Sequence, residues 1–387
     1  MQTLLGGLDP ADFLDRHWQK RPLLVRAAFP HWADPLVPEE LAGLACEANV
    51  NSRLVLERGG EQPWQVEYGP HAEQRFLDLP ETHWTLLVQD VDRHVPAAAT
   101  LLEPFGFLPD WRVDDVMVSY AAPQGSVGPH VDAYDVFLVQ GRGRRRWEIS
   151  TQPVAPDNVM PGLDLRILRD FHAEQVFELG PGDMLYLPPG VAHHGIALEP
   201  CMTYSVGFRA PTHTELLEGV LEHALDELGD AEARYADPDL CLPAHRSEIT
   251  AEALARIRDR IQHLCLDPAR SARWFGRYVT APQGTSLVEA PEEPLADVAA
   301  LAVRAEQAGG LWRDPACRFA FVREGEALWV FAHGEAQRVP AAAAEGAAWL
   351  CDQRHYPAAT LAAHWAGPLG ALLLNWYNHG YVRDDTF

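Results

Sequence analysis

The sequence predicts a mainly β jelly roll, followed by a helical segment and a small winged-helix α+β domain. From about residue 113 to 210 it contains short strands separated by Gly- and Pro-containing turns, with no helices between them. After this region come two long amphipathic helical patterns, and then a stretch in which helical patterns surround one predicted hairpin. With 387 residues the chain is too long for a single ordinary core, so we expect two or three domains.

The residues before the β region mix helical and extended patterns. A helix is expected over residues 9–21, because Asp9 can cap it and Pro10 suits the first helical position. The further elements expected here are strands at 23–25, 53–56 and 84–88 and helices that begin near 37 and span 96–102.

Short apolar runs bounded by Gly- and Pro-containing turns predict the strands of the β region itself. The strands are expected at 116–120, 135–140, 145–149, 175–179, 183–187 and 203–208. In a barrel or jelly roll of this kind, the two segments that carry His130 and His193 would be neighbouring strands.

The chain after Pro211 is predicted to be helical. A T-x-x-E capping box at Thr212 opens one helix that extends to 228, and a cap at Thr250 opens a second that extends to 266. The sheet predicted beside these helices is too small to cover both apolar faces. The helices could still pack on the barrel, and a helical dimer interface is equally plausible.

The last hundred residues are expected to form a separate small unit after a linker near 281–294. A hairpin, helices and the linker together favour a winged helix. Its elements are expected at 317–322, 327–332, 341–353, 358–365 and 369–377. The predicted domains are therefore a catalytic domain with N-terminal helices over 1–210, a helical dimerisation region over 211–280 and the winged-helix-like domain over 281–387.

Composition excludes several classes of protein. The net charge of −24 argues against general nucleic-acid affinity and suits a cationic partner or a salty cytoplasm. No apolar run is long enough to span a membrane, and no secretory signal is expected. The six cysteines are scattered, which is typical of free thiols in a reducing cytoplasm. We therefore expect a cytoplasmic protein.

A His and a carboxylate lie two residues apart at His130 and Asp132. Side chains at i and i+2 of a strand point to one face, so this pair can offer a nitrogen and an oxygen to the same ion. A further imidazole follows a Pro-Pro-Gly turn, where His193 and His194 are adjacent. Only one of these can face the metal, and strand geometry alone does not choose between them. Two His and one carboxylate form the facial triad of Fe(II) oxygenases, with zinc as the competing metal.

A basic run contains Arg144, Arg145 and Arg146. Strand alternation turns Arg145 to the face opposite its two neighbours, so either Arg145 or the flanking pair points into the barrel. An inward arginine would be costly without an anion, and a dicarboxylate co-substrate matches the guanidinium fork. Ser119 on the first strand could donate a further hydrogen bond to that anion, or it could simply bond to backbone.

Several motifs together make the sequence resemble the JmjC-domain ribosomal oxygenases of the cupin superfamily. The resemblance is to the bacterial branch that hydroxylates an arginine of a large-subunit ribosomal protein, the sixteenth of the L series. It extends to residues 18–23 and to the order of the later domains. The motifs are Ser119, His130-Val131-Asp132, Tyr134–Phe137, Gln140-Gly141, Arg144–Trp147, Pro188–Gly190 and Tyr204–Arg209.

The resemblance implies roles for individual residues. His130, Asp132 and His193 take the positions of the iron ligands. Arg145 takes the place of the basic residue that holds the distal carboxylate of 2-oxoglutarate, and Ser119 stands beside it. Fe(II) is the implied metal, with 2-oxoglutarate and O₂ as co-substrates. His194 departs from the pattern, since close relatives carry an acidic residue there.

The resemblance also implies a protein arginine hydroxylase whose substrate is a basic ribosomal protein and whose assembly is a homodimer, with no direct DNA binding and no membrane association. A carboxylate near the pocket mouth should grip the substrate guanidinium, and the candidates are Asp114, Asp115 and Asp135. Two alternatives stay open at this point. One is a histidine hydroxylase or demethylase with the same iron site, and the other is a non-enzymatic cupin-like metal-binding module.

Overall fold

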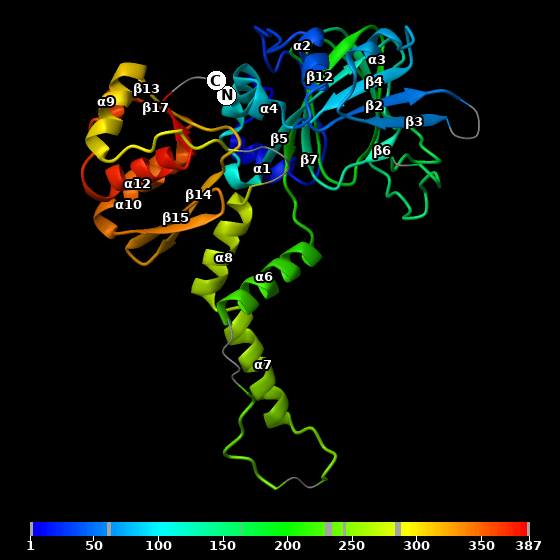
Figure 1. Cartoon of the computed structure of the whole chain (residues 1–387). Coiled ribbons are helices and arrows are strands. Elements are labelled where there is room, and N and C mark those ends of the chain that lie inside the picture. The colour runs from blue at the N-terminus through cyan, green and yellow to red at the C-terminus, as the bar shows by residue number, and fades with distance from the viewer. Residues whose placement is uncertain are drawn as a thin grey trace.

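The computed structural model describes residues 3–59, 63–163, 165–228, 234–242, 245–282 and 288–384. Figure 1 shows a β-rich body, a smaller α+β unit beside it, and three helices, α6 to α8, that extend below the two. The jelly roll, helical segment and winged-helix unit predicted from the sequence are therefore confirmed as the fold class. The linker expected at 281–294 falls partly on residues 283–287, which lie outside the described residues.

The β-rich body consists of two antiparallel sheets. An eight-stranded sheet has the order β1-β10-β7-β12-β5-β4-β2-β3, and a four-stranded sheet has the order β6-β11-β8-β9. The strands are β1 (Leu23–Val25), β2 (Ser52–Glu57), β3 (Trp64–Tyr68), β4 (Trp84–Val88), β5 (Val113–Ala121), β6 (His130–Val131), β7 (Asp135–Gln140), β8 (Arg145–Ser150), β9 (Gln175–Leu179), β10 (Met184–Leu187), β11 (Ala192–Ala197) and β12 (Cys201–Phe208).

Short helices cover the outer face of the larger sheet. They are α1 (Pro10–Arg16), α2 (Pro38–Leu44), α3 (Glu73–Leu77), α4 (Val91–His94) and α5 (Pro96–Ala99), with the 3₁₀ helices η1 (Thr100–Phe105) and η2 (Asp110–Arg112). An aromatic core joins these helices to the sheet: Phe13 of α1 lies 5.0 Å from Tyr186 and 5.8 Å from Phe137, measured between ring centroids.

The first helix ends earlier than the sequence pattern indicates. α1 begins after the Asp9 cap, as expected, but it ends at Arg16 and not at residue 21. Gln19 adopts a left-handed φ of 57°, and its N–H donates to the Tyr186 hydroxyl at 2.8 Å. This turn lays the Trp18 ring against Tyr186, so tertiary packing ends the helix.

The helical segment comprises α6 (His213–Leu228), α7 (Ala251–Cys265) and α8 (Pro268–Thr280). Sequence analysis missed α8 as a separate element. One side of α6 packs on α8, where Gly219 faces the Trp274 ring. The opposite sides of α6 and α7 carry large exposed apolar side chains, namely Leu217, Leu221, Leu225, Leu254, Ile257 and Ile261. The apolar surplus expected from the sequence is therefore exposed in the single chain.

The C-terminal unit has its own core around Trp376, Tyr356 and Leu373. The predicted hairpin forms, and a third strand extends it to a three-stranded sheet. The second small sheet of this unit and its first helix were not predicted. The elements are α9 (Val298–Ala308), β13 (Gly310–Arg313), β14 (Phe319–Glu324), β15 (Ala327–Ala332), β16 (Glu335–Val339), η3 (Ala341–Ala343), α10 (Ala344–Asp352), β17 (His355–Pro357), α11 (Ala358–Leu361), α12 (Gly367–Asn378) and β18 (Val382–Arg383). Within the described residues, no helix is long and apolar enough to cross a membrane.

Candidate metal centre and co-substrate pocket

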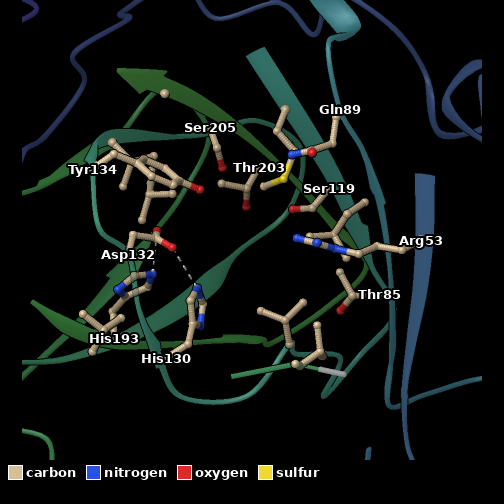
Figure 2. A pocket seen from close by; sticks show the side chains of 18 of the residues that line it. Arg53, Thr85, Gln89, Ser119, His130, Asp132, Tyr134, His193, Thr203 and Ser205 are labelled. Carbon is tan, nitrogen blue, oxygen red and sulfur yellow. Dashed lines mark ion pairs between the residues drawn. The ribbon is translucent and has the colours of Figure 1, made fainter. Parts of the chain in front are cut away.

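The two His-bearing segments are directly paired strands. β6 pairs with β11 so that His130 lies opposite His193. The turn before β11 requires a left-handed φ of 85° at Gly190, whose N–H donates to the backbone oxygen of Asp132 at 3.0 Å. Strand pairing and this turn therefore bring His130, Asp132 and His193 together from distant parts of the sequence (Figure 2).

These three side chains offer one potential ligand atom each, all within 4.8 Å of one another. The Nε2 atoms of His130 and His193 lie 3.9 and 3.6 Å from the Asp132 carboxylate oxygens. The Nδ1 atoms lie 2.9 and 3.0 Å from the backbone oxygens of Gly128 and Val191. Those carbonyls favour an Nδ1–H tautomer, which leaves each Nε2 lone pair facing the centre, as a metal ligand requires.

His194 faces away from this group. Its Nδ1 lies 3.7 Å from Glu148, and its ring meets Phe171 edge-on. His193 is 2% exposed, and burial, together with the His130 ring, lowers the pKa of His193 to about 4. Neutral His193, and not His194, therefore shares the centre with Asp132.

Arg145 lies on the inner face of β8. The residue is 3% exposed, whereas the side chains of Arg144 and Arg146 are 55% and 38% exposed, so the predicted alternation places Arg145 inward. Its Nη1 donates to the hydroxyls of Ser119 at 3.2 Å and Thr203 at 3.3 Å. Within the described residues it forms no ion pair, and its Nε has no partner. This buried guanidinium therefore lacks a counter-anion.

Arg145, Ser119 and the metal group line one cavity of about 320 Å³. The lining also includes residues that sequence analysis missed, namely Arg53, Thr85, Gln89, Met117, Tyr134, Thr203 and Ser205. Figure 2 shows the labelled side chains among them around the cavity. Strand register explains part of this set: Arg53, Leu87, Ser119 and Thr203 form one row across β2, β4, β5 and β12.

Of the three acidic residues considered for the substrate guanidinium, only Asp115 lines the cavity. Asp135 is fully buried and accepts from the Tyr186 hydroxyl at 2.6 Å, while Asp114 lies on the opposite face of β5 and pairs with Arg209. Those two candidates were therefore wrong. Burial and the nearby Asp92 raise the pKa of Asp115 to about 8.

Comparisons with known proteins agree on the relationship. The JmjC domain family matches residues 100–216, and the ROXA-like winged helix family matches residues 259–383. The ribosomal protein uL16 3-hydroxylase of Escherichia coli (strain K12) is 44% identical over 285 residues, which cover 73% of this chain and 74% of that protein. The chain belongs to the JmjC-domain ribosomal oxygenases.

Solved structures and a second relative support this assignment. The X-ray structure of E. coli ycfD has a TM-score of 0.87 at 37% identity and covers 97% of this chain and 98% of that chain. A structure of YcfD in complex with cobalt and 2-oxoglutarate has a TM-score of 0.83 over the same shares. The probable ribosomal oxygenase of Haemophilus influenzae is 37% identical over 64% of this chain and 61% of that protein.

The residues present fit the cofactors of 2-oxoglutarate oxygenases. Two imidazoles and one carboxylate suit Fe(II), and no thiolate lies among the three. The buried Arg145 is an independent indication, because a structural metal site would not require a nearby cation without an anion partner. A dicarboxylate supplies that anion and can also reach a metal.

Proposed function

We propose that this ribosomal oxygenase is an Fe(II)- and 2-oxoglutarate-dependent dioxygenase that hydroxylates an arginine of ribosomal protein uL16. One observation carries the proposal. A single cavity combines the His130, Asp132 and His193 group with a buried cation, Arg145, and a buried acid, Asp115, and neither Arg145 nor Asp115 forms an ion pair within the described residues. The cavity therefore suits one anionic and one cationic ligand at the same time.

His130, Asp132 and His193 would hold the iron through Nε2, a carboxylate oxygen and Nε2. Bound Fe(II) with 2-oxoglutarate and O₂ supplies the oxidising power to insert one oxygen atom into a C–H bond, as 2-oxoglutarate is converted to succinate and CO₂. The side chains of the protein would position the metal, the co-substrate and the substrate relative to one another. Three protein ligands leave room for a two-toothed co-substrate and O₂.

Arg145 would bind the distal carboxylate of 2-oxoglutarate. A guanidinium fork pairs with a carboxylate through two charge-assisted hydrogen bonds, and the Ser119 hydroxyl, which accepts from Nη1, can donate one more. The Thr203 hydroxyl already donates to Gln140 Oε1, so it orients Arg145 and does not bond to the carboxylate. The Arg145 guanidinium also stacks on Trp147, 4.9 Å from the ring centroid, which fixes its plane. The co-substrate would therefore enter a site that is already organised.

Asp115 would bind the guanidinium of the substrate arginine. It lies on β5 with its carboxylate in the cavity, and Oδ2 already accepts from the Asp90 N–H at 2.9 Å, which leaves Oδ1 for a ligand. The Tyr134 ring, also in the cavity lining, can pack against the aliphatic part of the same side chain. A histidine substrate would not need this carboxylate, so the cavity favours arginine.

The partner would be a basic protein and not DNA. The net charge of −24 favours encounter with a basic ribosomal protein. A ribosomal substrate would in turn imply a cytoplasmic location. Several winged-helix arginines are engaged within the chain: Arg313 pairs with Asp110, Arg318 with Asp114 and Arg323 with Glu345. These side chains are not available as a phosphate-binding surface. The exposed apolar sides of α6 and α7 would form a homodimer interface.

The substrate assignment is tested by incubating purified protein with uL16, Fe(II) and 2-oxoglutarate. We expect a gain of one oxygen on an arginine of uL16, detected by mass spectrometry of its peptides, together with succinate. A protein that decarboxylates 2-oxoglutarate but never oxidises uL16 would refute the substrate while leaving the iron site standing.

The metal assignment is tested with a matched pair of variants. His193→Ala removes a proposed ligand, whereas His194→Ala removes a neighbour that faces Glu148. We expect only His193→Ala, like Asp132→Ala, to abolish Fe(II) binding measured by equilibrium dialysis, and with it succinate production. Equal losses in the two His variants would contradict the assignment.

A further inference from the structure

The strand that carries Asp115 is incompletely paired. β5 pairs with β12 from Val113 to Ala121, with a register shift between Val113 and Val116, but its pairing with β4 ends at Val118, opposite Val88. Residues 113–117 therefore form an open edge on that side. Backbone groups on such an edge need other hydrogen-bond partners if they are buried.

The winged-helix domain supplies one of these partners. Arg318, which immediately precedes β14, donates from Nη2 to the backbone oxygen of Asp114 at 2.5 Å and lies 3.5 Å from its carboxylate. The next group on the same edge, the N–H of Val116, donates to Oδ1 of the buried Asp92 at 2.8 Å. Arg318 thus takes the place of a missing strand at this point of β5.

A second contact fixes the segment that leads into β5. Asp110 of η2 lies 2.8 Å from Nη2 of Arg313 and 3.8 Å from Nη2 of Arg354, both of the winged-helix domain. The Arg313 side chain is only 3% exposed, so its ion pair with Asp110 is largely shielded from solvent. The winged-helix domain therefore holds the chain at Asp110 and at Asp114, just before Asp115.

We propose that Arg318 is a positioning residue for Asp115, and that the winged-helix domain is thereby a working part of the arginine-binding pocket. The inference rests on the proposed function. Asp114 and Asp115 point to opposite faces of β5, so a hydrogen bond that fixes the Asp114 backbone also fixes the direction in which Asp115 enters the cavity. The metal group and Arg145 lie on other strands, and Ser119, the β5 residue that Arg145 contacts, lies where β5 is paired on both sides, away from the open edge.

The test separates binding of the protein substrate from chemistry. Arg318→Ala should raise the KM for uL16 by roughly tenfold, the size expected when a buried charge-assisted hydrogen bond is lost. Its kcat should stay within about twofold, and the KM for 2-oxoglutarate in decarboxylation without uL16 should not change. Arg323→Ala is the matched control, because Arg323 lies on β14 of the same domain and pairs with the exposed Glu345. An Arg318→Ala enzyme with a normal KM for uL16 overturns the proposal.

A double-mutant cycle with Asp115→Asn tests the route of the effect. If Arg318 acts through Asp115, Arg318→Ala should not raise the KM for uL16 of the Asp115→Asn enzyme any further. If the two substitutions act independently, their fold-increases in KM would multiply in the double variant, and the proposal would be overturned. If Arg318→Ala does not fold by circular dichroism, Arg318→Lys should raise the KM severalfold, and an unchanged KM overturns the proposal. Wild type that never oxidises uL16 overturns the proposed function itself, whereas failure of the Arg318 variants alone overturns only this inference.

Discussion

Two buried ionisable residues of the cavity, Arg145 and Asp115, are placed to bind ligands and do not pair with each other. Arg145 contacts hydroxyls and a backbone oxygen, and Asp115 accepts a backbone N–H, but within the described residues neither meets an opposite charge in an ion pair. Burial of an unpaired charge disfavours the folded state. Binding of an anion at Arg145, and of a cation at ionised Asp115, would therefore offset the free-energy cost of burying these groups.

The first prediction concerns the co-substrate. Arg145→Ala removes a buried charge-assisted contact worth roughly 1.5–3 kcal/mol, so the KM for 2-oxoglutarate should rise by about 10- to 150-fold. Arg144→Ala and Arg146→Ala should change it much less, since both side chains are largely outside the cavity. Succinate production at varied 2-oxoglutarate measures this. If all three variants behave alike, Arg145 is not the anion-binding residue.

The second prediction concerns pH. Burial and the charges of Asp92, Asp90 and Asp114 raise the pKa of Asp115 to about 8, and Tyr134 faces the same space and stays protonated because its own pKa is raised. Only ionised Asp115 pairs with a guanidinium, so kcat/KM for uL16 should rise by up to roughly tenfold between pH 7 and pH 9. Decarboxylation without uL16 serves as the reference, to which each rate is normalised.

Asp115→Asn is the control for this profile. It should flatten the rise in kcat/KM and lower activity on uL16 at every pH. It should also stabilise the folded protein as pH rises from 4 toward 8. Over that range the unfolded carboxyl ionises while the buried one stays protonated, so the wild type loses stability as pH rises, and asparagine does not. A normalised rise that persists in Asp115→Asn would assign the titration to another group.

The site could be predicted where chemistry is local in the sequence. The i, i+2 spacing placed His130 with Asp132, and alternation placed Arg145 opposite its neighbours. The choice between His193 and His194 came from the family resemblance, because two adjacent histidines give a strand pattern no preference. Arg53 was missed, since it reaches the cavity only through the register of β2 and β4 with β5.

At the scale of elements, the pairing of β8 with β11 places a glycine, Gly195, beside the side chains that form the co-substrate site. Gly195 lies opposite Trp147, and a Cβ at Gly195 would stand 2.6 Å from the Trp147 ring and 2.8 Å from Nε of Arg145. The backbone oxygen of Gly195 also accepts from Nη2 of Arg145 at 3.4 Å. Glycine is thus required here for close approach of two side chains and not for an unusual φ.

The third prediction follows from this contact. Gly195→Ala should push the Trp147 ring and the Arg145 guanidinium out of place, cost about 1–3 kcal/mol of stability and raise the KM for 2-oxoglutarate. Gly180→Ala, in the turn between β9 and β10, is the control, because its Cβ would meet nothing within 4 Å. Thermal unfolding and succinate production measure the two effects. A Gly195→Ala enzyme with normal affinity for 2-oxoglutarate would show that Trp147 does not hold Arg145.

Elements with a strong local period were predicted, and those fixed by packing were not. The strands of the jelly roll and the helices α6 and α7 follow their apolar patterns closely. The missed elements include β3, an edge strand with no fully buried residue, and α8, which only two residues separate from the end of α7. The early end of α1 depends on Tyr186, which is distant in sequence.

At the scale of the whole molecule, one side of α6 carries an exposed apolar stripe. Leu221 is 49% exposed and Leu225 is 67% exposed on α6, while Val220 and Ala224 on its other side are buried. An exposed apolar stripe of this kind indicates an interaction surface. A homodimer through α6 and α7 would cover it and offer a folded basic protein a wider acidic surface than one chain provides.

The last prediction separates assembly from chemistry. Leu221→Glu combined with Leu225→Glu places charges in the apolar stripe and should give monomers, measured by light scattering after size-exclusion chromatography. Leu77→Glu combined with Val303→Glu, at exposed apolar positions outside α6 and α7, should leave the dimer intact. Decarboxylation of 2-oxoglutarate without uL16 needs only the cavity of one chain, so it should survive in the monomer. Hydroxylation of uL16 should weaken, because the monomer presents only half of the acidic surface. A monomer that hydroxylates uL16 at the full rate would show that the dimer is dispensable for substrate binding.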